Sequence, residues 1–167
     1  MCALVAAHGY AGTTVGGIAA SAGVSRTTFY EQFDSKEDCF RAAYDSVAGS
    51  LIDAVEAASA PQENPRAALA AGIDAFLEWF AARPELAATF IVEVHRAGPD
   101  ALVQRAAIFV RFCRVLNRNA PERHPAAAMA AVTSINAMAF ELVREGRADE
   151  LPRLAAAARH VAEKLLS

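Results

Sequence analysis

The side chains best suited to contact a ligand lie in one short polar run near the start of the chain. The run reads SRTTFYEQ at residues 25–32. Its candidate contact residues are Ser25, Arg26, Thr27, Thr28, Tyr30 and Gln32. An arginine can donate two hydrogen bonds to one guanine, and a threonine can contact a thymine methyl group or a phosphate. These residue types at helical spacing therefore suit the groove of a nucleic acid.

Two short helices joined by a tight turn are needed to hold this run in place. Thr13 or Thr14 can cap the first helix by accepting an unpaired backbone N–H, and Ser25 can cap the second. Gly23 lies between them, where the chain must reverse and glycine adopts a left-handed backbone most easily. The residues expected to face inward are Val15, Ile18 and Ala19 in the first helix and Val24, Phe29 and Phe33 in the second. The segment from Thr13 to Asp38 therefore predicts a helix-turn-helix.

A longer pattern surrounds this motif. It runs from about Leu4, in LVAAHGYAGTTV, to the tract FYEQFDSKED, and covers roughly the first quarter of the chain. The informative positions of that tract are Phe29, Tyr30, Phe33, Ser35, Lys36 and Glu37. The pattern resembles the TetR family of bacterial transcription regulators, which implies binding to a double-stranded DNA operator. Arg26 is the residue best able to specify a base.

The resemblance also implies contacts with the DNA backbone. The residues that lie where relatives make such contacts are Thr14, Tyr30, Gln32 and Lys36. Lys36 also falls in the first turn of the next predicted helix, whose N-terminal amides favour a phosphate. Two structural alternatives stay open, because Tyr30 can be a half-buried aromatic that braces the motif and Lys36 can be a solvated lysine.

The charge of this region is unfavourable for binding DNA. From Met1 to Val47, three Lys and Arg residues oppose five Asp and Glu residues, which gives a formal charge of −2. Gly16 and Gly17 occupy the first turn of the helix before the turn, and each glycine costs about 1 kcal/mol relative to alanine. We therefore expect modest affinity that depends on a few well-placed contacts.

The first helix begins at Met1. TetR-family members usually have about ten more residues before a segment like LVAAHGY. Two interpretations follow: the native protein starts upstream of this chain, which we favour, or the first helix is reduced to about two turns from Met1 to His8.

The composition is that of a soluble helical protein, which we expect in the cytoplasm. The chain has 167 residues, of which 54% are hydrophobic and 21% charged, enough for a substantial core. No uninterrupted apolar run of eighteen residues predicts a membrane span, and no basic-then-apolar leader predicts a signal peptide. Cys2, Cys39 and Cys113 are far apart, so we expect three reduced thiols and neither a metal site nor a disulfide framework.

The remaining sequence predicts helices separated by proline and glycine, without an alternating strand pattern. The expected helices cover residues 35–58, 66–83, 84–97, 100–119, 126–146 and 149–166. In helix 100–119 the expected inward positions are Leu102, Ala106, Phe109, Val110, Cys113 and Leu116. The sequence thus predicts an all-α fold of about nine helices. We divide it into a three-helix helix-turn-helix DNA-binding domain at 1–47 and a ligand-binding and dimerisation domain at 48–167.

The last two predicted helices form an antiparallel pair with wide apolar stripes. The stripe of the final helix contains Leu151, Leu154, Ala155, Ala158, Val161, Ala162 and Leu165, and that of its partner contains Met129, Val132, Ile135, Asn136, Ala139, Phe140 and Val143. The TetR resemblance implies that two copies of this hairpin pack as a homodimer. The alternative is that both helices only complete the core of a monomer.

Aromatic residues of the second domain predict an apolar pocket for a small apolar or amphipathic effector. The candidate ligand contacts are Phe76, Trp79, Phe80, Phe90, Val94, Phe109, Phe112 and Phe140. Polar residues that could orient the effector are Glu93, His95, Arg111 and Asn136. Each aromatic residue has the alternative of being ordinary core. A ligand among these helices would swing the long helix and change the spacing of the DNA-reading helices.

No catalytic constellation is present in the sequence. The four histidines are scattered, and no nucleotide-binding, hydrolase or zinc-protease motif occurs. We therefore expect no enzyme and no cofactor. The expected function is that of a ligand-responsive regulator, usually a repressor in this family, that binds a palindromic operator as a dimer. The alternative is a helical ligand-binding dimer of the same shape with lost or weak DNA binding.

Overall fold

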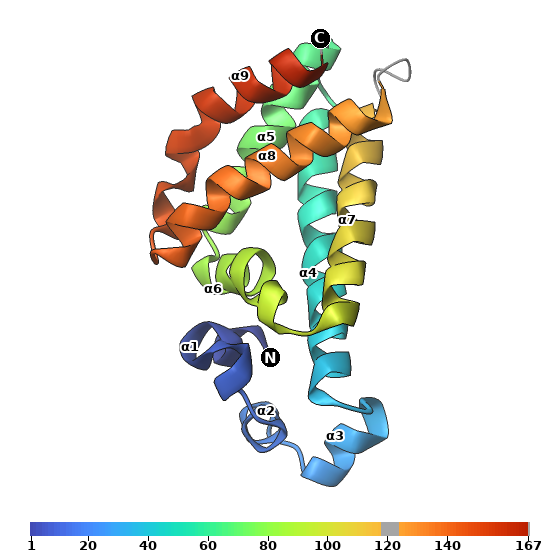
Figure 1. The fold of residues 1–167 in the computed structure, drawn as a ribbon, viewed down its shortest axis with the longest axis vertical. Coiled ribbons are helices and arrows are strands. Elements are labelled where there is room, and N and C mark those ends of the chain that lie inside the picture. The colour runs from blue at the N-terminus through green and yellow to red at the C-terminus, as the bar shows by residue number, and fades with distance from the viewer. Residues whose placement is uncertain (118–123, 167) are drawn as a thin grey trace.

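The computed structural model describes residues 1–117 and 124–166. Within these ranges the chain forms nine α-helices and no strand, which confirms the all-α prediction (Figure 1). The helices are α1 (Cys2–Gly12), α2 (Val15–Ala22), α3 (Arg26–Gln32), α4 (Lys36–Ser59), α5 (Pro65–Ala81), α6 (Pro84–Ala87), α7 (Pro99–Asn117), α8 (Pro125–Arg144) and α9 (Ala155–Leu166). The predicted end of helix 100–119 lies outside the described residues.

The helices form an elongated molecule with the first three gathered at one end. Figure 1 shows α8 and α9 at the opposite end and α4 running lengthwise between the two groups. The main hydrophobic core lies among α4, α5, α7, α8 and α9, and a small separate core under α2 and α3 contains Ile18, Ala19, Phe29 and Cys39. Helix α4 contributes side chains to both cores, so a displacement of this helix would affect both.

The helix-turn-helix has the predicted caps. Thr14 accepts the Gly17 N–H at 3.1 Å and begins α2, and Ser25 accepts the Thr28 N–H at 3.0 Å and begins α3. Gly23 ends α2 with a left-handed φ of 67°. The same cap chemistry begins α4, where Ser35 accepts the Asp38 N–H at 3.0 Å. Side chains that accept unpaired N–H groups thus fix all three helix starts.

One inward residue of this motif was predicted wrongly. Val24 is 42% exposed, whereas Phe29 is buried and Phe33 is partly buried against the small core. Val24 lies in the turn between α2 and α3, so the helical spacing used for the prediction does not apply to it.

Helix α1 is broken near its C-terminal end. Gly9 has φ 69° and ψ 164°, so the regular helix runs for about two turns, to His8. Thr13 does not cap α2, because its hydroxyl is turned back and donates to the Gly9 carbonyl at 2.8 Å. The break exposes the Tyr10 N–H to a partner outside the helix.

The predicted helix 84–97 is helical but not one α-helix. After α6, residues Ala88–Val92 form a π-helical turn (η1) and Glu93–Arg96 a 3₁₀ turn (η2). Thr89 lies in the π turn, where its hydroxyl is within bonding distance of the carbonyls of Glu85 and Cys2. Short π segments inside helices occur frequently at functional sites.

The inward face of α7 differs from the prediction. Leu102 and Val110 are each 41% exposed and Ala106 is also exposed. Two polar side chains turn toward the protein instead: Gln104 donates to the Arg41 carbonyl at 2.9 Å, and Arg105 donates to Asn136 at 3.0 Å. These long-range partners rotate the buried face to Ala101, Ile108, Phe109, Phe112 and Cys113.

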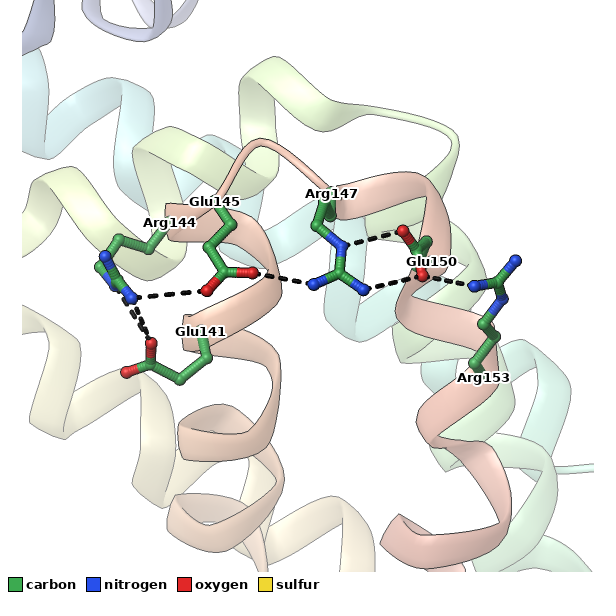
Figure 2. A network of polar contacts seen from close by, with 6 residues as sticks. All are labelled: Glu141, Arg144, Glu145, Arg147, Glu150 and Arg153. Atoms are coloured by element: carbon green, nitrogen blue, oxygen red, sulfur yellow. Dashed lines mark hydrogen bonds and ion pairs between the residues drawn. The ribbon is translucent and has the colours of Figure 1, made fainter.

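The last hairpin is antiparallel as predicted, but its second helix begins later. Residues Ala148–Leu154 form a 3₁₀ segment (η3), and Leu165 is 38% exposed while Leu166 is buried. Pro152 in η3 lacks an N–H, which limits regular helix there. Figure 2 shows the ion pairs that cross the turn: Arg147 donates to Glu150 at 2.9 Å and to Glu145 at 2.9 Å. Because these charged side chains are largely exposed, the ion pairs between α8 and η3 contribute little to the free energy of unfolding.

Candidate DNA-binding surface and effector cavity

The outer face of α3 presents its predicted contact residues to solvent. Arg26, Thr27, Thr28, Tyr30 and Gln32 are all exposed. Tyr30 is 51% exposed and its ring meets the Phe29 ring edge-on at 5.3 Å. Tyr30 therefore braces the motif and still offers its hydroxyl to a partner. Thr14 and Ser25 are also exposed, but each uses its hydroxyl to cap a helix.

Lys36 points toward α1 in this structure. Its Nζ donates to the carbonyls of Tyr10 at 2.8 Å and Thr13 at 3.0 Å, and lies 4.2 Å from the centre of the Tyr10 ring. The lysine thereby adds a second donor to the Tyr10 carbonyl, which also accepts the Thr13 N–H, and bonds the Thr13 carbonyl just after the broken helix. It holds α1 against the start of α4, so its charge is directed away from solvent.

The remaining charges leave the reading face with few cations. Asp38 pairs with Arg41 at 3.3 Å on α4. On α3 (Arg26–Gln32), Arg26 is the one cationic residue. A surface of this kind depends on hydrogen bonds from α3 more than on phosphate neutralisation.

An apolar cavity of about 50 Å³ lies among α4, α5, η1, α7 and α8. Its lining consists of Val55, Gly72, Ile73, Phe76, Phe90, Phe109, Phe112, Val115, Leu116, Val132, Ile135 and Asn136. Four of the eight predicted ligand contacts are in this lining: Phe76, Phe90, Phe109 and Phe112. Asn136 is its one polar side chain, and this residue was among those expected to orient an effector.

The other four predicted contacts lie elsewhere. Phe80 and Val94 are completely buried core residues, and Trp79 packs against the Arg83 guanidinium at 4.6 Å. Phe140 lines a second, outer pocket. Helical spacing placed these residues near the cavity but could not show which side of each helix faces it.

The outer pocket lies between α7 and α8 and opens to solvent. It has a volume of about 340 Å³ and is lined by His95, Arg105, Thr133, Asn136, Ala137, Phe140 and Glu141. Asn136 lines both spaces, so they adjoin at this residue. Burial lowers the pKa of His95, and the nearby Arg105 and Arg96 charges lower it further, which favours the neutral imidazole.

The sequence prediction missed Arg105. Its guanidinium lies 4.2 Å from the centre of the Phe109 ring and donates to Asn136. Burial lowers the pKa of Arg105. The available signal was an arginine four residues before Phe109, one helical turn away on the same face of the helix.

Two polar residues expected near the effector instead connect different parts of the molecule. Glu93 is buried and accepts the Tyr10 N–H at 2.7 Å, next to the break in α1. It also pairs with Arg96. Arg111 pairs with Asp45 at 3.1 Å and joins α7 to α4. Glu93 thus connects the segment that contains Phe90 to the N-terminal helices.

Residues 2–43, which contain these N-terminal helices, match the family model of the bacterial regulatory proteins of the tetR family. The first quarter of the chain is thus a tetR-family segment. The match covers the helix-turn-helix and the first turns of α4, which confirms the family predicted from the sequence. No curated protein sequence matches the chain.

Solved structures of TetR-type regulators share the fold over nearly the whole chain. The transcriptional regulator FadR from Bacillus subtilis, in complex with stearoyl-CoA, is 20% identical with a TM-score of 0.83, over 99% of this chain and 94% of that one. The fatty acid degradation regulator FadR from Bacillus halodurans is 17% identical with a TM-score of 0.83, over 96% and 92%. A tetR-family regulatory protein from Rhodococcus RHA1 is 23% identical with a TM-score of 0.70, over 99% and 92%. All three are structures of regulatory proteins, and they share the fold of this chain.

Proposed function

We propose that this chain is a ligand-responsive transcription regulator that binds a two-fold symmetric DNA operator as a homodimer. The observation that carries the proposal is the capped α3, which presents Arg26, Thr27 and Thr28 to solvent within the TetR segment. In a dimer, two such helices enter successive major grooves about 34–36 Å apart. A regulator of this kind works in the cytoplasm, and we expect it to repress.

The outer faces of α8 and α9 support dimerisation. Helix α8 is long and apolar enough to cross a membrane by length and composition alone, yet only 33% of its most apolar stretch is buried. Several exposed positions are small or apolar: Ala126 on α8, and Ala156, Ala157 and Leu165 on α9. An apolar helix pair with small outer residues can pack closely on a second copy of itself. This packing accounts for the apolar character of α8 without a membrane.

The apolar cavity supports an effector with a hydrocarbon chain. The Bacillus subtilis structure of the same fold holds stearoyl-CoA. At about 50 Å³, the cavity here is much smaller than the roughly 300–1,000 Å³ of typical ligand pockets. A chain that enters must therefore push its walls apart, including Phe90 on η1.

This movement of η1 provides a route to the DNA-binding helices. Glu93 follows Phe90 by three residues and is bonded to Tyr10, while Lys36 fixes Tyr10 to α4. Displacing Phe90 would pull on this chain of contacts and change the position of α1 and α4. The effector would lower DNA affinity to the extent that it binds the two arrangements unequally.

The second candidate function is a ligand-binding dimer without a DNA role. The observation in its favour is the low positive charge of the reading face, where Lys36 is turned toward α1.

Fluorescence anisotropy of the chain on the DNA upstream of its own gene, over a salt series, separates the two functions. We expect salt-sensitive binding that prefers this fragment to random DNA of equal length. Equal binding to both DNAs, in the presence of a measured dimer, would favour the second function.

A further inference from the structure

Arg105 is partly buried without a counter-charge. Arg105 Nη2 donates to the Asn136 amide oxygen at 3.0 Å, and the guanidinium lies over the Phe109 ring. Its Nε is buried and has no hydrogen-bond partner. Over residues 1–117 and 124–166, no carboxylate lies within ion-pair distance of Arg105.

The acidic residue of the same outer pocket already pairs with another arginine. Glu141 lines the same outer pocket, but its carboxylate accepts from Arg144 at 2.6 Å and 3.1 Å. A guanidinium that has lost part of its water and lacks an anion is stabilised by an oxyanion that accepts from its planar set of N–H groups. Arg105 is therefore prepared for a charge that the described part of the chain does not supply.

The position of Arg105 indicates the shape of the missing partner. Phe109, over which the guanidinium lies, is a wall of the apolar cavity, and Asn136 lines the cavity and the outer pocket. A ligand bound to Arg105 thus has an apolar space on one side and solvent on the other.

We infer that Arg105 binds the oxyanion of an amphipathic effector whose hydrocarbon chain enters the apolar cavity. The inference rests on the proposed function and names the chemistry that the effector must have. The oxyanion can be the carboxylate of a free fatty acid or a phosphate of an acyl-CoA, since both accept the same hydrogen bonds.

The test measures binding to the full chain by isothermal titration calorimetry with four probes: dodecanoate, 1-dodecanol, dodecanoyl-CoA and CoA. We expect at least one charged lipid to bind about tenfold or more tightly than the alcohol, as one charge-assisted hydrogen bond provides. Tight binding of dodecanoate identifies a carboxylate. Binding of dodecanoyl-CoA alone identifies the phosphates.

Variants of the arginine assign this preference to one residue. Arg105→Gln is expected to remove the advantage of the charged lipid and to leave binding of the alcohol unchanged. Arg105→Lys, which retains the charge but not the planar set of donors, is expected to recover part of it. Arg114→Gln, on an exposed arginine of the same helix, is the matched control and should behave like the unmodified chain.

Three results would overturn the inference: equal affinity for the alcohol and the charged lipids, an unchanged preference in Arg105→Gln, or no binding of any probe. The probe comparison on the unmodified chain decides the matter even if Arg105→Gln fails to fold. Anisotropy on DNA in the same samples distinguishes failure of this inference from failure of the proposed function. A chain that binds its operator but none of the probes would still be a regulator, and only the proposed class of effector would be wrong.

Discussion

The carboxylate of Glu93 accepts the backbone N–H of Tyr10 at 2.7 Å across 83 residues of sequence. The bond exists because Gly9 breaks α1 and frees the Tyr10 N–H, and because η2 places a buried acid opposite the break. It joins the segment that lines the apolar cavity to the helices of the helix-turn-helix. The relationship makes Glu93 the clearest candidate for coupling the two sites.

Replacing Glu93 by alanine should separate effector binding from DNA release. The Tyr10 N–H loses its acceptor, so we expect the free energy of unfolding to fall by about 1–3 kcal/mol. We also expect effector to change DNA affinity less than in the unmodified chain, where such coupling is typically about 1–3 kcal/mol. Chemical denaturation and anisotropy with and without dodecanoyl-CoA measure the two effects.

Two further variants calibrate this prediction. Glu93→Gln retains an acceptor oxygen and should preserve most of the coupling. Glu78→Ala removes an exposed acid of α5 and should change neither quantity. If Glu93→Ala responds to effector as strongly as Glu78→Ala does, the route through Tyr10 is wrong.

Replacing Lys36 by alanine should act on stability more than on DNA electrostatics. The Thr13 carbonyl loses its Lys36 donor and the Tyr10 carbonyl loses one of two donors, so we expect a loss of about 1–3 kcal/mol in the free energy of unfolding. Because the ammonium points toward α1, the slope of log affinity against log salt should stay unchanged. A slope reduced by about one would show instead that Lys36 contacts a phosphate.

Replacing Arg26 by alanine should weaken sequence selectivity. Arg26 is exposed at the first position of α3, where a bidentate contact to guanine is worth about 1–3 kcal/mol of discrimination. Anisotropy should show the difference between the specific fragment and random DNA shrinking by that amount. Arg114→Ala, on an exposed arginine of α7, is the control for a general loss of charge. Identical losses in both variants would contradict a specific role for Arg26.

Placing a glutamate at Ala157 should dissociate the proposed dimer. Ala157 is exposed on α9, and a charge there would be buried in the interface. Sedimentation velocity should show the dimer of the unmodified chain shifting to monomer. Ala107→Glu, on an exposed alanine of α7, is expected to remain dimeric. A dimeric Ala157→Glu variant would place the interface elsewhere.

Local signals in the sequence predicted the motif well. Thr14, Gly23 and Ser25 perform the expected cap and turn functions because these depend on residues within four positions along the chain. The face of α7 could not be predicted in this way. It depends on the bond between Arg105 and Asn136, which are 31 residues apart.

The candidate site was predictable only in part for a similar reason. The aromatic content indicated a pocket, and Phe76, Phe90, Phe109 and Phe112 do line one. Glu93 was expected beside the effector, but its place opposite Gly9 follows from the break in α1 and from the change of helix type after α6. Neither irregularity has a local sequence signal as strong as a helix cap.

The π turn at Ala88–Val92 places one wall of the cavity in a hydrogen-bond register that differs from that of an α-helix. A π-helical hydrogen bond joins residues five apart, whereas an α-helical one joins residues four apart. One residue of an α-helix corresponds to a rotation of about 100°. If these five residues closed into α-type hydrogen bonds, Glu93 would swing by about that angle and leave Tyr10. The segment would then respond to ligand by switching between two hydrogen-bond registers rather than by a displacement that grows gradually with the size of the ligand.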